Sequence, residues 1–275
     1  LQTEDPPLML YAQGRIPADW PDAIAVVGSR NPTAQGLQNA REFSRSFAQA
    51  GWTVVSGLAL GVDGAAHEGA LEGAPEGRLA TIAVVGTGLD RVYPSRHRDL
   101  AHRIAERGLI LSEYPLGTGP LAENFPQRNR ILSALARGTL VVEAALQSGS
   151  LITARLAAEQ GRDVFAIPGS IHSAQARGCH ALIKQGAKLV ETAQDVLEEL
   201  APGVHAPAPA AVDAPVPPAS SALLDALGWD PTGLDALVAR TGIAASTLQA
   251  QLLEFELAGR VARLPGGLFQ RTANA

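Results

Sequence analysis

A short run in the middle of the chain carries side chains that suit a nucleic-acid strand. Phe125 is followed by Arg128 and Arg130 on a predicted helix that Gly138 ends. Guanidinium groups bind phosphates as planar forks, and an aromatic ring beside them suits a stacked base. The residues alone leave an alternative open, in which the two arginines pair with Glu123 or Glu143 and the phenylalanine belongs to the core.

A second run of small polar residues follows a predicted buried strand at residues 140–143. Ser148, Gly149 and Ser150 precede an apolar segment that is expected to form a helix. Serine is a favoured N-cap residue, so we expect Ser150 to cap this helix. Free N–H groups at a helix start bind phosphate oxygens well, and the second run therefore complements the first.

Both runs belong to a pattern in which short apolar strands alternate with helices. The strands are predicted at residues 24–28, 53–57, 81–86, 109–112, 140–143, 163–167 and 188–190, with an edge strand at 8–11. This pattern predicts a parallel sheet with helices on both faces, whose ligands bind beyond the carboxyl ends of the strands at the switch point. Small residues at those ends allow close approach, and they include Gly28, Ser29, Ser56 and Gly57.

The end of the chain has a different organisation. Residues 1–200 form the predicted α/β domain, residues 201–220 an Ala/Pro-rich linker, and residues 221–275 a winged helix-turn-helix domain. The last domain has four arginines and five acidic residues, a net charge of −1, and its third predicted helix has no Lys or Arg. A helix that reads a DNA groove needs such donors, so we expect a protein-contact or structural role.

Composition limits the classes of function. With a net charge of −5 the chain has no overall basic field, so any anion site must be local. The single Cys179 excludes an internal disulfide and a cysteine-based metal site, and it fits a reducing, cytoplasmic setting. No signal peptide or membrane-spanning apolar run is present. The chain starts at Leu1 rather than Met, from which we expect that something N-terminal was removed.

Signals for a cofactor or for acid–base catalysis are weak. The glycine turn at residues 86–91 lacks the third glycine of a dinucleotide site, and no Walker A sequence is present. Asp63 and His67 lie four residues apart on a predicted helix. A satisfied helix-start aspartate and a packed histidine explain this pair better than catalysis does. We therefore expect no cofactor and no metal.

The chain strongly resembles the DNA-processing protein A (DprA/Smf) family. The matching motifs follow the family's order across about residues 6–200 and include VVGSR at 26–30, SGLA at 56–59, SEYP at 112–115, FPQRNR at 125–130 and SGSLIT at 148–153. The resemblance implies an extended Rossmann fold that binds single-stranded DNA without catalysis. It also implies a homodimer that protects incoming strands in natural transformation and brings them to the RecA recombinase.

The resemblance also implies site residues. The expected contacts to the strand are Gly28, Ser29, Arg30, Ser56, Gly57, Phe125, Arg128, Arg130, Ser148, Gly149 and Ser150, with Lys184 as a weaker candidate. The expected dimer interface is an apolar stripe on a helix at residues 192–200, made of Val196, Leu197 and Leu200. In a monomer this stripe would instead pack inward. The chain departs from the family pattern at Ala122, Glu123 and His180.

Two rival functions remain. One is a Rossmann nucleotide hydrolase of the lysine-decarboxylase-like or phosphoribohydrolase type, which carries a Pro-Gly-Gly-x-Gly-Thr loop. Residues 168–171 read Pro-Gly-Ser-Ile and lack that loop. The other is a duplex-DNA regulator that works through the winged helix, which the charge of that domain disfavours. We therefore expect a non-catalytic single-stranded DNA-binding protein.

Overall fold

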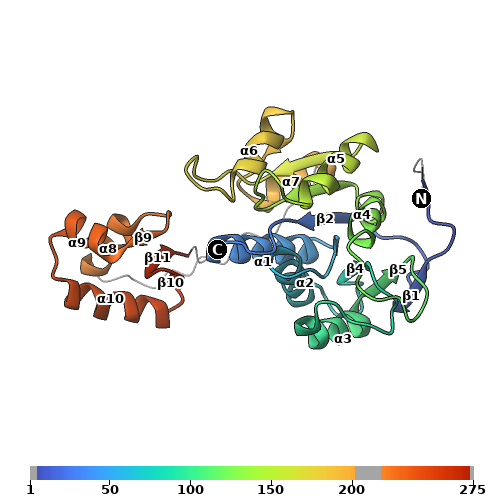
Figure 1. The fold of residues 1–275 in the computed structure, drawn as a ribbon, viewed down its shortest axis with the longest axis horizontal. Helices are drawn as coiled ribbons and strands as arrows, with labels where there is room; N and C mark the ends of the chain where they lie inside the picture. Colours follow the sequence, from blue (N-terminus) through green and yellow to red (C-terminus); the bar gives the residue numbers. More distant parts are fainter. Residues whose placement is uncertain (1–4, 202–217, 273–275) are drawn as a thin grey trace. The chain divides into compact units, whose positions relative to one another are not determined.

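The computed structural model describes residues 5–201 and 218–272, which form two compact units with one sheet each (Figure 1). The strands of the larger unit are β1 (Tyr11–Gly14), β2 (Ala23–Val27), β3 (Thr53–Ser56), β4 (Thr81–Val85), β5 (Leu109–Ser112), β6 (Gly138–Val141), β7 (Asp163–Ala166) and β8 (Lys188–Leu189). They are ordered β1-β5-β4-β3-β2-β6-β7-β8. All neighbours are parallel except β1, which pairs antiparallel with β5.

The central strands are buried on both faces, as their continuous apolar runs predict. Every residue of β2, β3, β4, β5 and β6 is buried. Along β2 the side chains alternate between two core clusters: Ile24 and Val26 face one, and Ala25 and Val27 face the other. The prediction of a sheet with helices on both faces is confirmed.

Seven helices of the described larger unit supply those two layers. They are α1 (Ala34–Gln49), α2 (Val62–Gly73), α3 (Arg98–Arg107), α4 (Asn124–Leu135), α5 (Ser150–Glu159), α6 (Arg177–Lys184) and α7 (Ala193–Leu200). Residues of α1, α2, α3 and α7 pack in the first cluster, and residues of α4, α5 and α6 pack in the second. The thiol of Cys179 lies in the second cluster, where burial raises its pKa to about 12.

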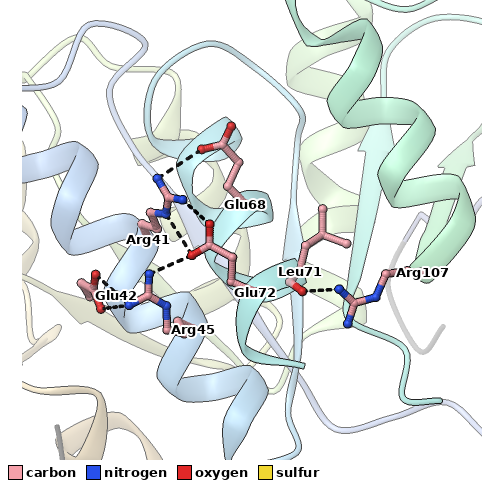
Figure 2. A network of polar contacts seen from close by, with 7 residues as sticks. All are labelled: Arg41, Glu42, Arg45, Glu68, Leu71, Glu72 and Arg107. Carbon is pink, nitrogen blue, oxygen red and sulfur yellow. Dashed lines mark hydrogen bonds and ion pairs between the residues drawn. The ribbon is translucent and has the colours of Figure 1, made fainter. Parts of the chain in front are cut away.

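Helices α1 and α2 approach closely and share a network of ion pairs (Figure 2). A Cβ atom on Gly69 or Gly73 of α2 would collide with backbone carbonyls of α1, so both positions need glycine. On the surface, Glu72 accepts hydrogen bonds from Arg41 and, at 2.8 Å, from Arg45. These guanidinium groups are neutralised by carboxylates and add little to any positive field.

The apolar stripe of α7 faces the core, which corrects the prediction of a dimer interface there. Val196 and Leu197 are fully buried and Leu200 nearly so, in the same cluster as Val190. The cause is tertiary packing: all three side chains lie in the core cluster, and β6 starts with Gly138, where a Cβ atom would lie 3.2 Å from the Leu200 side chain. These three side chains are not available to a partner in this conformation.

The smaller unit has the elements of a winged helix. They are α8 (Pro218–Leu227), β9 (Thr232–Gly233), α9 (Leu234–Thr241), α10 (Ala245–Leu257), β10 (Val261–Leu264) and β11 (Leu268–Arg271). The strands form an antiparallel sheet in the order β10-β11-β9. Helix α8 begins inside the stretch predicted as linker, and most of that stretch, residues 202–217, lies outside the described residues.

In the described parts of both units, no helix is long and apolar enough to cross a membrane.

Candidate nucleic-acid interface

A cleft of about 660 Å³ opens at the carboxyl ends of β2 and β6. It is lined by the turn after β2, the first turns of α4 and the start of α5, which include Arg30, Phe125 and Ser150. The chain runs from β2 outward through β3, β4 and β5 and then returns to place β6 on the other side of β2. The cleft therefore lies at the switch point of the sheet, where the sequence predicts a ligand.

Two side chains that line the cleft, Arg30 and Phe125, lie close to each other. Arg30 is exposed, and its guanidinium carbon lies 5.7 Å from the centre of the Phe125 ring. Phe125 is half-buried, so the alternative that it belongs to the core does not hold. Gly86 makes room for the ring, because a Cβ atom there would lie 3.2 Å from it. A cation and an aromatic face are thus presented together, as a phosphate and a base require.

The turn after β2 fixes the position of Arg30. The Ser29 N–H donates to the carbonyl of Glu143 at 2.7 Å, and the Val62 N–H donates to the carbonyl of Ser29 at 3.1 Å. A Cβ atom on Gly28 would lie 2.7 Å from the Val62 side chain. Gly28 and Ser29 both line the cleft. The Ser29 N–H is already hydrogen-bonded inside the protein and is not free for a ligand.

The start of α5 differs from the prediction. The helix begins at Ser150, and its N-cap is Gly149, which makes no side-chain capping bond. The prediction of Ser150 as N-cap is wrong, because Ser150 is already the first residue inside the helix. The Ser148 hydroxyl lies 2.7 Å from the Ser150 hydroxyl and accepts a long bond of 3.4 Å from the Ser150 N–H. All three residues line the cleft, with Gly149 exposed.

Arg128 is not the exposed phosphate fork that the sequence predicts. Its side chain is only 4% exposed, at the floor of the cleft. The Nη1 group donates to the carbonyl of Gly57 at 2.7 Å and to that of Val84. Gly57 must be glycine, because a Cβ atom there would occupy the place of the guanidinium group. Burial lowers the pKa of Arg128, and the nearby Asp63 counteracts this.

Asp63 balances this buried cation and holds the neighbouring loop. Its Oδ2 atom accepts from the N–H groups of Gly57 at 3.2 Å and Ala59 at 3.3 Å. Burial raises the pKa of Asp63, while the charge of Arg128 and the two N–H donors act to lower it. Between the two N–H groups, Leu58 adopts a left-handed conformation with φ 59°. Such a turn is unfavourable for leucine and persists because the surroundings hold it in place.

One histidine supports this loop, and a second one is buried in α2. His97 donates from Nδ1 to the carbonyl of Leu58 at 3.0 Å. His67 is fully buried, with Nδ1 2.7 Å from the hydroxyl of Thr81, and burial lowers its pKa to about 3. The predictions of a helix-start aspartate at Asp63 and of a packed histidine are confirmed.

Arg130 lies outside the cleft. Its Nη2 atom donates to both carboxylate oxygens of Glu113, at 2.7 and 2.9 Å, and Nε donates to Asp5 at 2.8 Å. The alternative in which the arginine pairs with carboxylates therefore holds for Arg130, but its partners are Glu113 and Asp5 rather than Glu123 or Glu143. Two residues along a helix turn it by about 200°, so Arg128 and Arg130 cannot face one site.

The remaining predicted residues divide into buried and distant ones. Ser56 is fully buried and donates to the carbonyl of Val26 at 2.7 Å. Lys184 is exposed at the end of α6 and does not line the cleft. Tyr93, which the sequence did not single out as a site residue, lines the cleft in the loop after β4. Its sequence signals were an aromatic residue in a loop after a strand end and the pair Tyr93-Pro94, which is one of the motifs that match the family.

The comparisons with known proteins agree with this fold. The family model for DNA recombination-mediator protein A matches residues 1–201, and that for the DprA winged helix domain matches residues 206–267. Protein Smf of Escherichia coli is 45% identical over 277 residues, which cover 97% of this chain and 72% of that protein. DNA processing protein DprA of Streptococcus pneumoniae is 47% identical over 195 residues, 71% of this chain and 67% of that protein.

Solved structures of DNA processing protein A also match this fold. The structure of DNA processing protein A from Streptococcus pneumoniae matches with a TM-score of 0.65 at 47% identity, over 70% of this chain and 66% of that one. A structure of DNA processing protein A from Helicobacter pylori, which concerns its single-stranded DNA binding mode, matches with a TM-score of 0.65 at 34% identity, over 74% of this chain and 91% of that one. The chain belongs to the DNA recombination-mediator protein A family.

Proposed function

We propose that this chain is a non-catalytic single-stranded DNA-binding protein whose strand lies in the cleft at the ends of β2 and β6. The observation that carries the proposal is the exposed Arg30 guanidinium beside the half-buried Phe125 ring inside that cleft. A phosphate contact and a stacked base need no particular sequence, so such a site accepts any strand. The Helicobacter pylori relative, whose structure concerns a single-stranded DNA binding mode, supports this ligand.

The acid–base candidates support a role without catalysis. His67 is fully buried and does not line the cleft, and its lowered pKa keeps it neutral. Asp63 lines the cleft, but it is buried, and its Oδ2 atom already accepts from two backbone N–H groups. Neither group is free to exchange a proton with a ligand. We propose no cofactor and no metal for this function.

Family membership supports a proposal for the wider role. We propose that the protein protects incoming strands during natural transformation, brings them to the RecA recombinase, and works as a homodimer in the cytoplasm. The burial of the α7 stripe means that a dimer needs another surface than Val196, Leu197 and Leu200. The proposed DNA-contacting set is reduced to cleft residues, with Arg30 and Phe125 as its central pair.

For the winged helix we propose a protein-contact or structural role. Helix α10, in the position of a recognition helix, has no basic residue. The lack of basic residues on α10 favours a partner other than the phosphates of a duplex, because a helix that reads a groove needs donors for phosphates and base edges.

The test is a salt series with fluorescent single strands of several base compositions, and with a duplex of equal length. Arg30→Ala should weaken single-strand binding about tenfold or more for every composition, and should flatten the salt slope by about 0.7. The matched control is Arg103→Ala, which removes an exposed arginine of α3 outside the cleft. Unchanged affinity and slope in the Arg30 variant would contradict the proposal.

A further inference from the structure

We infer that Tyr93 stacks a base of the bound strand and forms a two-ring platform with Phe125. This inference rests on the proposed function and extends its site to the loop after β4. Tyr93 lines the same cleft, and 47% of its surface is exposed. Its ring centre lies 5.5 Å from that of Phe125, with the ring planes tilted by 40°.

The distance between the rings decides how bases can bind. A centroid separation of 5.5 Å is that of two aromatic rings in direct contact, so no base fits between them. Bases must therefore stack on the outward surfaces of the pair. The 40° tilt directs the two surfaces differently, which suits two consecutive bases of a strand that is not held in a duplex.

Single exposed aromatic residues are common on protein surfaces and need no ligand. Three observations together distinguish Tyr93: it lines the cleft, it contacts Phe125, and the guanidinium of Arg30 lies 5.7 Å from the same Phe125 ring. The platform thus has a cation beside it that can hold the phosphate of a stacked nucleotide. Trp20 offers a contrast, because it is 56% exposed but does not line the cleft.

The loop that carries Tyr93 is tied down on both sides. The Thr87 hydroxyl donates to the carbonyl of Arg91 at 3.0 Å, before the tyrosine. After the tyrosine, the His97 N–H donates to the carbonyl of Pro94 at 3.0 Å. The His97 ring also donates from Nδ1 to the carbonyl of Leu58. A ring held in place before binding loses little conformational freedom when the ligand arrives, which favours affinity.

The test compares Tyr93→Ala, Tyr93→Leu and Tyr93→Phe on two probes of equal length, a thymidine homopolymer and an abasic strand with the same phosphates. Both Tyr93→Ala and Tyr93→Leu should weaken binding to the homopolymer on the order of tenfold, and Tyr93→Phe should bind normally, because stacking needs the ring and not the hydroxyl. All three should keep the wild-type salt slope and wild-type affinity for the abasic strand. Trp20→Ala, the control for an exposed aromatic, should change nothing.

The outcomes separate this inference from the proposed function. If Arg30→Ala weakens binding and the Tyr93 variants do not, the inference is overturned while the cleft remains the DNA site. An equal loss on both probes would also overturn it, because that loss would not come from a base. If neither Arg30 nor Tyr93 affects any strand, the proposed function itself fails.

Discussion

Replacing Arg128 by methionine distinguishes a buried structural arginine from one that binds phosphate. Methionine keeps most of the length of the side chain and removes its charge. The carbonyls of Gly57 and Val84 lose their donor, and Asp63 is left as a buried carboxylate without its nearby cation. Breaking a buried pair in this way costs about 3–5 kcal/mol. At about 2–4 °C per kcal/mol for a unit of this size, Tm should fall by about 6–20 °C.

The loss of stability in the Arg128→Met variant should depend on pH, because the variant changes the pKa of Asp63. Burial already raises the pKa of this carboxyl above its ordinary value of 3.8, and Arg128 opposes the rise, so the variant raises it further. A carboxyl with a raised pKa binds more protons in the folded state. Its contribution to stability is full below the unfolded pKa and is lost as pH rises through the folded pKa. The difference in unfolding free energy between wild type and variant should therefore be larger at neutral pH than near pH 4.

The assay combines urea unfolding, followed by circular dichroism at the two pH values, with strand binding well below Tm. We expect the folded variant to keep the salt slope of the wild type, because Arg128 makes its hydrogen bonds inside the protein. Adding Asp63→Asn should recover part of the lost stability at neutral pH. Arg103→Met is the exposed control. A fully stable variant with weaker binding and a flatter salt slope would refute the reasoning and restore the phosphate contact.

Two further changes test the core. Because burial lowers the pKa of His67 to about 3, below that of an unfolded histidine, the protein should lose about 2 kcal/mol of stability between pH 7 and pH 5. His67→Gln should lack this loss in urea unfolding, and an unchanged pH dependence would count against it. Leu197→Glu places a charge at a fully buried position, so circular dichroism should show loss of folding while Glu198→Ala stays folded. If light scattering instead finds a folded, monomeric Leu197→Glu protein, the result would support the dimer interface on α7.

The sequence predicted the position of the cleft in the sheet better than the burial of the side chains that line it. Strands buried on both faces and small residues at their carboxyl ends are local signals, and parallel strands bring those ends to one edge of the sheet. The cleft at β2 and β6 follows from them. Arg128 is different, because its depth depends on Gly57, 71 positions away, which leaves the space that the guanidinium group fills.

The sequence also could not predict which residues pair with Arg130 or which side of α7 is buried. Glu113 and Asp5 lie 17 and 125 positions from Arg130, and neither separation carries a periodic signal. An apolar stripe such as that of Val196 and Leu197 predicts a buried face, but not whether its own core or a partner buries it. Only the packing against Val190 and its neighbours decides that question.

The distribution of charge limits how many arginines could contact a DNA strand in the proposed site. Arg41 and Arg45 pair with glutamates of α1 and α2, Arg130 pairs with Glu113, and Arg128 is buried. Arg30 is exposed in the cleft, where its guanidinium group lies over the Phe125 ring.

A site with few phosphate contacts has a shallow salt dependence, since each contact adds about 0.7 to the slope for a single strand. Stacking must then supply much of the binding free energy. Rings can stack only on bases that are not already paired and stacked in a duplex. The proposed preference for single strands therefore rests on the aromatic part of the cleft, and removing Phe125 or Tyr93 should reduce that preference more than removing Arg30 does.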